Sequence, residues 1–316
     1  MKAEKVIRQE TSFSENLTDI NGTKFTIDSV EPITGAEIVK LNPGYNSYYY
    51  TAKHKKTKIV IHNTVGVLRS DIAAMTKPNW HVSVPFVIAR DGTIYQLFDP
   101  SMWSYHLGKG AVGGNKTNSK SSIAIELSSY GPLKRVNDTL ETMYSKITYK
   151  DSEGNSKTTG TDVYCTIDET QHYTELPVSY RGYKYFNGYT DAQLKSLNFL
   201  VDYLCVKFNI PKEILGESAR YELFTSNKEA KVYTGICSHV NFIENGKWDI
   251  GPEMDWSYLF PNKEIVIDEP IEIKPNEVPV LVDEPIEKEP PVIPVSIKKD
   301  SILEILLNIL KKILNR

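Results

Sequence analysis

Two strand-like runs separated by Asp91-Gly92 constrain the fold of this chain more tightly than any other local pattern. Phe86-Val87-Ile88-Ala89-Arg90 precedes the dipeptide, and Thr93-Ile94-Tyr95-Gln96-Leu97 follows it. Asp-Gly between such runs is a strong β-hairpin signal, because both positions of the favoured two-residue turn need positive φ. We therefore predict an antiparallel strand pair here, with the two residues forming the turn.

Other segments predict buried strands and two helices around this hairpin. The strand-like runs are rich in Ile and Val: 58–62, 122–127 and 234–239. A short helix is expected over 71–75 with Ser70 as its cap. A longer helix opens at Thr190, where Thr190 and Gln193 form a capping box, and Pro211 ends it. Strands interleaved with helices predict an α/β (α+β) fold with a mixed central sheet flanked by helices.

The composition divides the chain into four parts. Residues 1–50 are expected to be an N-terminal extension with weak strand patterning, and 51–260 a domain. That domain contains an insertion at about 134–188, which lacks clear periodicity and includes a polar loop over 151–160. Residues 261–299 are acidic and rich in proline, as in a semi-rigid linker. Residues 300–316 predict an amphipathic helix.

Charge and cysteine content exclude several classes of protein. The 37 basic and 40 acidic residues give a net charge of -3, which argues against a nucleic-acid binder driven by bulk positive charge. Three widely spaced cysteines suggest reduced thiols and no disulfide framework. We see no apolar signal segment at the N-terminus and no run of about 18 apolar residues. We therefore expect a protein made in the cytoplasm without a signal peptide.

Two histidines and one aspartate form the first candidate site. His62 ends an apolar strand run, and His239 ends another. Asp249 follows ten residues later in a Gly- and Pro-bounded loop that can fold back on His239. Two imidazoles and a carboxylate, with a fourth position left for water, are typical of catalytic zinc. For any one histidine alone, a hydrogen-bonded structural role remains the alternative.

Six motifs in order resemble the zinc-dependent N-acetylmuramoyl-L-alanine amidases shared by phage lysins, bacterial recycling amidases and animal peptidoglycan-recognition proteins. The similarity covers residues 57–257, apart from the insertion, and an ordered set of six is far more specific than any single motif. The motifs are Ile59-Val60-Ile61-His62-Asn63-Thr64, Phe86 to Gln96, Tyr105-His106-Leu107-Gly108, Ser122-Ile123-Ala124-Ile125-Glu126-Leu127, Tyr189-Thr190-Asp191-Ala192-Gln193, and Ser238-His239-Val240 through Asp249-Ile250-Gly251-Pro252.

The resemblance implies a role for individual residues. His62, His239 and Asp249 would hold one Zn²⁺ per chain, and Asp249 takes a place that is Cys in some members. Glu126 resembles the general base, which accepts a proton from the attacking water and returns it to the leaving amine. Lys247 resembles the lysine that stabilises the oxyanion. The alternatives are a solvated strand-end carboxylate for Glu126 and an exposed loop lysine for Lys247.

Further residues are expected to contact substrate. His106 matches the histidine of the family's Trp-His-Ala-Gly segment, which here has Tyr105 in place of Trp. We predict substrate contacts for His106, Asn63 and Trp103. The chain also departs from the family pattern at Pro85, where relatives carry His in Ser-x-His-Tyr, and at Ile250, which replaces the first proline of Asp-Pro-Gly-Pro.

The implied reaction is hydrolysis of the amide bond between N-acetylmuramic acid and L-alanine in peptidoglycan, with the bacterial cell wall as the place of action. The missing signal segment and the added tail favour a phage-type lytic or virion-associated enzyme over a recycling amidase. The alternatives are a peptidoglycan-binding module without catalysis and a virion structural component. For the 300–316 helix, three roles stay open: docking on the enzyme, association with another copy or a virion protein, and contact with a membrane surface.

Overall fold

The computed structural model describes residues 2–151 and 154–261, and the predicted 300–316 helix lies outside them, as does the 261–299 linker after its first residue. Contacts within the chain divide the described residues into two units, 2–145 with 161–261 and the short segment 146–160. The short segment consists of the hairpin β9 (Thr148–Lys150) and β10 (Ser156–Thr158), which lies within the predicted insertion.

The larger unit is built on a seven-stranded mixed sheet in the order β1-β2-β5-β4-β6-β3-β14. Its strands are β1 (Thr26–Ile33), β2 (Ala36–Asn42), β3 (Lys58–Asn63), β4 (Phe86–Ile88), β5 (Ile94–Gln96), β6 (Ser122–Leu127) and β14 (Gly235–Ser238). The strands β4, β6, β3 and β14 are mutually parallel, and β5 runs antiparallel to β4. The predicted fold class is confirmed.

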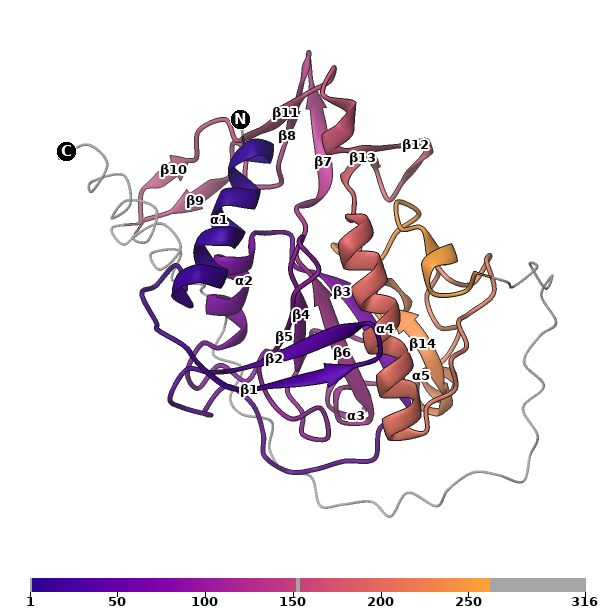
Figure 1. Cartoon of the computed structure of the whole chain (residues 1–316). Coiled ribbons are helices and arrows are strands. Elements are labelled where there is room, and N and C mark those ends of the chain that lie inside the picture. The colour runs from indigo at the N-terminus through magenta and orange to yellow at the C-terminus, as the bar shows by residue number, and fades with distance from the viewer. Residues whose placement is uncertain (1, 152–153, 262–316) are drawn as a thin grey trace. The chain divides into compact units, whose positions relative to one another are not determined.

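Helices cover both faces of this sheet, and Figure 1 shows α4 running along its strands. One face carries Ile59, Ile61, Ile123 and Ile125, which pack against α4. The other face packs against α1 and α2 at one side and against α5 at the other. The helices are α1 (Lys2–Asn16), α2 (Leu68–Met75), α3 (Asn115–Ser121), α4 (Asp191–Phe208) and α5 (Asn227–Val232), with short 3-10 turns η1 (Thr170–His172), η2 (His239–Asn241) and η3 (Trp256–Tyr258).

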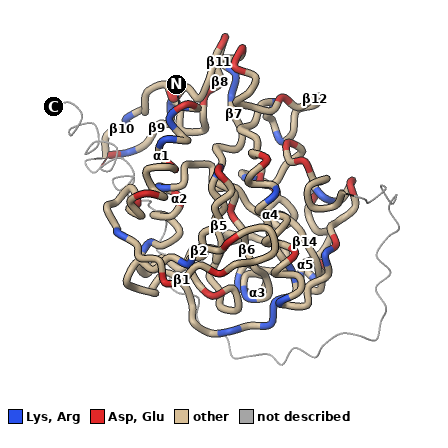
Figure 2. Tube along the Cα trace, viewed as in Figure 1, with Lys and Arg blue, Asp and Glu red and all other residues tan. Residues whose placement is uncertain are grey.

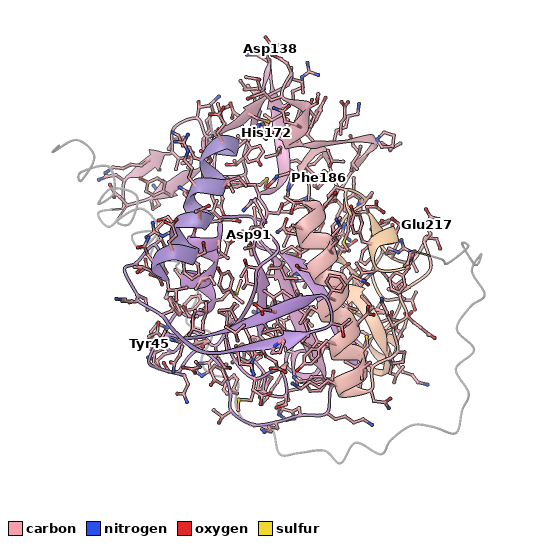
Figure 3. All side chains as sticks on the ribbon, viewed as in Figure 1. Tyr45, Asp91, Asp138, His172, Phe186 and Glu217 are labelled. Carbon is pink, nitrogen blue, oxygen red and sulfur yellow. The ribbon has the colours of Figure 1, made fainter. Side chains whose placement is uncertain are left out.

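A second, five-stranded antiparallel sheet occupies most of the segment predicted as an insertion. Its order is β11-β8-β7-β13-β12, with bounds β7 (Gly131–Val136), β8 (Thr139–Glu141), β11 (Val163–Thr166), β12 (Thr174–Tyr180) and β13 (Tyr183–Asn187). Asp138 lies at the tip of the β7–β8 hairpin (Figure 3). The strand β12 has no alternation of buried and exposed residues, because only Leu176 of its seven residues is buried.

Residues 2–50, expected to be an extension, are an integral part of the larger unit. The helix α1 buries Phe13 against Phe25 and Tyr95, and β2 pairs with β5. Glu10 of α1 is also buried and accepts a hydrogen bond from the backbone N–H of Arg90. The weak strand pattern reflects β1, an edge strand without a buried residue.

The hairpin is present, but its predicted two-residue turn is wrong. Only Gly92 has positive φ, at 90°, and Asp91 does not. The N–H of Gly92 donates to the carbonyl of Ala89, and the N–H of Ala89 donates to the carbonyl of Thr93. The connection between the strands therefore has three residues, Arg90, Asp91 and Gly92, and only Gly92 takes the left-handed conformation that this kind of turn needs.

Two helix ends also differ from prediction. The helix α2 begins at Leu68, and Ser70 donates to the carbonyl of Val67, so Ser70 is inside the helix and is not its cap. The capping box of Thr190 and Gln193 is confirmed. Left-handed Asn209 caps the other end of α4, two residues before Pro211, because this conformation satisfies the last carbonyls.

The charged residues of both signs are distributed along the described chain (Figure 2). Cys165, Cys205 and Cys237 are buried and free, as expected of reduced thiols. Among the described helices, none combines the length and the apolar character that a membrane span requires.

Candidate metal centre and active site

Three side chains from distant parts of the sequence bring their ligand atoms together in the larger unit. Nδ1 of His62 lies 2.9 Å from Nδ1 of His239. Oδ2 of Asp249 lies 3.0 Å from Nδ1 of His239 and 3.3 Å from Nδ1 of His62. All three residues are buried, and they form a group that could hold a metal ion.

The sheet positions two of these residues through its parallel strand pairs. His62 lies near the end of β3, and His239 follows directly after β14, the neighbouring strand. Asp249 returns to this place through the loop 239–249, where the N–H of Val240 donates to the carbonyl of Asp249 at 3.0 Å. Parallel strands that end side by side therefore place the two imidazoles together, and the loop adds the carboxylate.

A chain of hydrogen bonds behind His62 fixes which ring nitrogen carries a proton. The hydroxyl of Ser122 donates to the carbonyl of Asn118 at 2.6 Å, so its oxygen accepts from Nε2 of His106 at 2.8 Å. Nδ1 of His106 is then free to accept from Nε2 of His62 at 3.0 Å. Because a neutral imidazole carries one proton, Nδ1 of His62 is left with an unprotonated lone pair.

The same reasoning applies to His239. Its Nε2 lies 3.1 Å from the carbonyl oxygen of Leu107, which can only accept, so Nε2 is the donor. In the neutral ring, Nδ1 then presents a lone pair to Nδ1 of His62. Two lone pairs and a carboxylate oxygen this close repel one another unless a proton or a metal ion lies among them.

The donor set fits zinc. Zinc takes imidazole nitrogen and carboxylate oxygen at about 2.0–2.2 Å in a tetrahedral arrangement, which separates neighbouring ligand atoms by about 3.3 Å. The three separations of 2.9, 3.0 and 3.3 Å are close to this spacing. Partners on the outer nitrogens that fix the tautomer are also typical of metal-binding histidines.

The protonation states suit a metal ligand set. Burial, together with His239, lowers the pKa of His62 to about 4, so its ring is neutral near pH 7. Burial alone would raise the pKa of Asp249, but the imidazoles of His239 and His62 and the ammonium of Lys247 outweigh it and hold the pKa well below its usual range. At neutral pH the site therefore offers the neutral imidazole of His62 and the carboxylate of Asp249.

Glu126 lies on β6 directly beside His62 in the strand register. Its carboxyl group is buried, and its Oε2 atom has no hydrogen-bond partner among the described residues. Burial raises the pKa of Glu126 well above its usual value, Asp249 raises it further, and Lys247 lowers it. A carboxylate with a raised pKa is suited to accepting a proton and releasing it again.

Lys247 lies two residues before Asp249 and is half-buried. Its charge lowers the pKa values of His62, Asp249 and Glu126, so the ammonium acts on all three groups. The structure thus brings five predicted residues into one electrostatic cluster. No local sequence signal links Glu126 to Lys247.

The other three predicted site residues have partners inside the protein. Both ring nitrogens of His106 are engaged, so it lies behind His62 as its hydrogen-bond partner. Asn63 points to the opposite face of β3, where its amide donates to the hydroxyl of Tyr189 at 3.0 Å. Trp103 is buried and stacks on Tyr50 with 4.3 Å between ring centroids. Substrate contact by these three stays a prediction that their present contacts do not favour.

Two contributors to the site were missed by the sequence reasoning. The sequence predicts Ser122 only as the start of a strand, although this residue ends the hydrogen-bond chain behind His62. Leu107 contributes through its backbone carbonyl, which no side-chain pattern can reveal. A Ser four residues before the candidate base, on the same face of the strand, was the one available signal.

Residues 52–252 match the N-acetylmuramoyl-L-alanine amidase family. No curated protein matches the chain. Several solved structures do match it, all at low identity and low TM-score.

The AmiD amidase of E. coli, solved with anhydro-N-acetylmuramic acid-L-Ala-D-gamma-Glu-L-Lys, is 17% identical with a TM-score of 0.39. The match covers 73% of this chain and 65% of that one.

AmpDh3 of Pseudomonas aeruginosa, solved with anhydromuramic pentapeptide, is 15% identical to this chain, with a TM-score of 0.38. The match covers 69% of this chain and 64% of that one. The amidase LysC of Clostridium intestinale is 15% identical with a TM-score of 0.35, over 71% of this chain and 95% of that one. This chain thus spans less than two thirds of the lengths of AmiD and AmpDh3.

Proposed function

The chain belongs to the N-acetylmuramoyl-L-alanine amidase family, and on this premise we propose that it hydrolyses the amide bond between N-acetylmuramic acid and L-alanine in peptidoglycan, with one zinc ion per chain. His62, His239 and Asp249 would hold the ion. The single observation that carries the zinc assignment is the convergence of their three electron-rich ligand atoms within 3.3 Å of one another.

Zinc bound there would polarise the scissile carbonyl and make water more acidic. The protein's own groups perform the proton transfers. Glu126 accepts a proton from the attacking water, because its buried carboxylate has a raised pKa. It then returns the proton to the nitrogen of the leaving L-alanine, which departs as an amine.

Lys247 stabilises the negative charge that develops on the carbonyl oxygen. A fixed ammonium contributes most where water is excluded, and the neighbouring carboxylates and imidazoles are buried. His106 keeps the ring of His62 in one tautomer and one orientation, and the carbonyl of Leu107 does the same for His239.

The presence of Glu126 and Lys247 beside a complete ligand set favours catalysis over a module that only binds peptidoglycan. A binding module needs neither a buried base nor an unpaired carboxylate oxygen, which lowers stability. We further propose that the protein acts on the bacterial cell wall as a phage-type lytic enzyme, with 300–316 contacting a second copy, a virion protein or a membrane surface. The sequence pattern of the tail is the support for that part.

Digestion of purified peptidoglycan with mass analysis of the products tests the reaction. We expect intact glycan strands and released stem peptides with a free L-alanine amine, whereas new reducing sugars would show a glycosidase. Metal analysis of the purified protein should find about one zinc per chain.

His239→Ala is the matched variant for the metal. It removes one of three ligands and should abolish both stoichiometric zinc and hydrolysis, with the sheet still folded. Full hydrolysis by metal-free wild-type protein would contradict the zinc assignment while leaving the amidase assignment standing.

A further inference from the structure

The turn between β12 and β13 of the second sheet reaches the loop that carries Lys247 and Asp249. This turn holds Arg181, whose guanidinium donates to four backbone carbonyl oxygens of that loop. Nη1 lies 3.0 Å from the oxygen of Ile243, 2.9 Å from that of Glu244 and 2.8 Å from that of Lys247, and Nη2 lies 3.4 Å from that of Val240.

Three of these contacts, those with Ile243, Glu244 and Lys247, lie inside a loop whose ends are joined. The N–H of Val240 donates to the carbonyl of Asp249, which closes the loop 240–249 at its base. Carbonyl dipoles that converge inside a closed loop repel one another, and a planar cation with five N–H donors satisfies several of them at once. Arg181 therefore joins the 240–244 part of the loop to Lys247 through one guanidinium.

The loop also holds the turn in return. The indole N–H of Trp248 donates to the carbonyl of Arg181 at 3.2 Å, and the ring of Tyr183 meets that of Trp248 edge to face at 5.4 Å. A Cβ atom built on Gly251 would lie 2.9 Å from the ring of Tyr180, so this backbone packs closely against the turn. The contact is thus reciprocal, and it includes residues on both sides of Asp249.

The hairpin turn fixes where the side chain of Arg181 starts. Arg181 and Gly182, with φ of +46° and +87°, lie between Tyr180 and Tyr183, which pair across β12 and β13. Positive φ at both positions is the favoured geometry of a two-residue hairpin turn. The guanidinium of Arg181 also lies over the ring of Tyr180, 5.5 Å from its centroid, so the turn itself helps to hold this side chain.

We propose that Arg181 is a positioning residue for the active site, and that the second sheet serves the amidase by holding the loop that carries Lys247 and Asp249. This inference rests on the proposed function for its catalytic consequence. Its structural part, the ordering of residues 240–249 by Arg181, does not depend on metal or substrate.

The test compares Arg181→Met with Arg135→Met in the full chain. Arg135 is an exposed arginine of the same sheet, on β7, and its guanidinium contacts only Asn137 and Tyr185 among the hydrogen bonds of the described residues. In metal-free protein, we expect Arg181→Met to speed amide hydrogen exchange over residues 240–249 by about tenfold or more, with Arg135→Met like the wild type.

With zinc added, Arg181→Met should bind the ion about 10–100-fold more weakly, as measured by competition with a chelator. Its kcat should fall with KM little changed, because Lys247 acts on the developing charge of the transition state. A variant with wild-type exchange over 240–249, zinc affinity and kcat would overturn the proposal, even if its melting temperature were lower.

Arg181→Lys serves where Arg181→Met does not fold. Lysine keeps the charge but not the planar fork, so we expect intermediate exchange and zinc affinity, and wild-type values for both would overturn the proposal. A wild-type protein that bound no zinc would contradict the zinc assignment, but the exchange measurement would still decide whether Arg181 orders the loop.

Discussion

The two faces of the strands β3 and β6 differ sharply in what they bury. The face under α4 carries Ile59, Ile61, Ile123 and Ile125, all fully buried in an apolar cluster. The opposite face carries His62 and Glu126 at the same level of the two strands, above Val60 and Ala124. Successive residues of a strand point to opposite faces, so stability and chemistry alternate along the same six-residue segments.

This difference shows that the site is assembled at a cost to the fold. The apolar face removes carbon from water and gains stability. The other face buries carboxyl groups whose pKa values are raised by burial, including Glu126 and Asp71. Substitutions on the first face should therefore affect folding, and substitutions on the second should affect catalysis and can even stabilise the protein.

Glu126→Gln gives the largest expected effect. We expect kcat to fall by about 10²–10⁴-fold, because the amide cannot accept a proton, with zinc still bound. Since the pKa of Glu126 is raised, its ionised form opposes folding increasingly as pH rises above the unfolded value. The metal-free variant should therefore be at least as stable as the wild type at pH 8. Unchanged turnover would remove Glu126 from the role of base.

Ile125→Ala changes the residue next to Glu126 on the opposite face. Ile125 is fully buried, so the variant should lose about 3 kcal/mol of unfolding free energy through lost transfer energy and a cavity. Urea titration measures this loss. Zinc affinity and kcat of the folded fraction should match the wild type, and a large fall in kcat at low urea would show that the faces are not independent.

Asp71→Asn tests the electrostatic cost of the functional face. Burial raises the pKa of Asp71 to about 6, although hydrogen bonds from Ser128 and Thr64 offset part of the shift. In the wild type, the protonated carboxyl of Asp71 favours the folded state. This contribution to the free energy of unfolding is fully present below the unfolded pKa near 3.8, and it is lost as the pH rises through about 6. Asparagine can accept both hydrogen bonds, which share Oδ2, without becoming charged.

The variant should therefore gain about 2 kcal/mol relative to the wild type between pH 4 and pH 8. Unfolding free energies at both pH values measure this gain. Parallel pH profiles of the two proteins would count against a buried, ionised Asp71.

Ser122→Ala gives the smallest effect and breaks the hydrogen-bond chain at its end away from the proposed metal site. Nε2 of His106 would lose its acceptor, and His62 would be held less firmly in its tautomer. We expect zinc to bind about tenfold more weakly, with little change in melting temperature. Equal chelator-competition curves for the variant and the wild type would show that His62 is oriented by other contacts.

Local patterns in the sequence were enough to predict the strands around His62, Glu126 and His239, and the capping box of Thr190 and Gln193. These features depend on neighbouring residues, through β-branched runs and an i, i+3 pair of hydrogen bonds. The ligand set followed from ordered motifs, and the structure brings those three residues together.

Other features depend on contacts between distant segments. The place of residues 2–50 follows from Phe13 packing on Tyr95, and the second sheet follows from pairing between β7 and β13, about 50 residues apart. Neither segment has a repeating pattern of apolar residues from which its packing partner could be predicted. The role of His106 also depends on the fold, because its two ring nitrogens bond to His62 and Ser122, which are distant from it in the sequence.

Strand patterns and ordered motifs in the sequence predict which residues would hold a metal ion and which strands end beside them. Contacts between distant segments fix how those residues are oriented and what holds the loop of Lys247 and Asp249. Backbone carbonyls make most of those contacts, from Leu107 to His239 and from the 240–247 segment to Arg181. Every residue has a carbonyl, so only the folded chain selects the ones that matter.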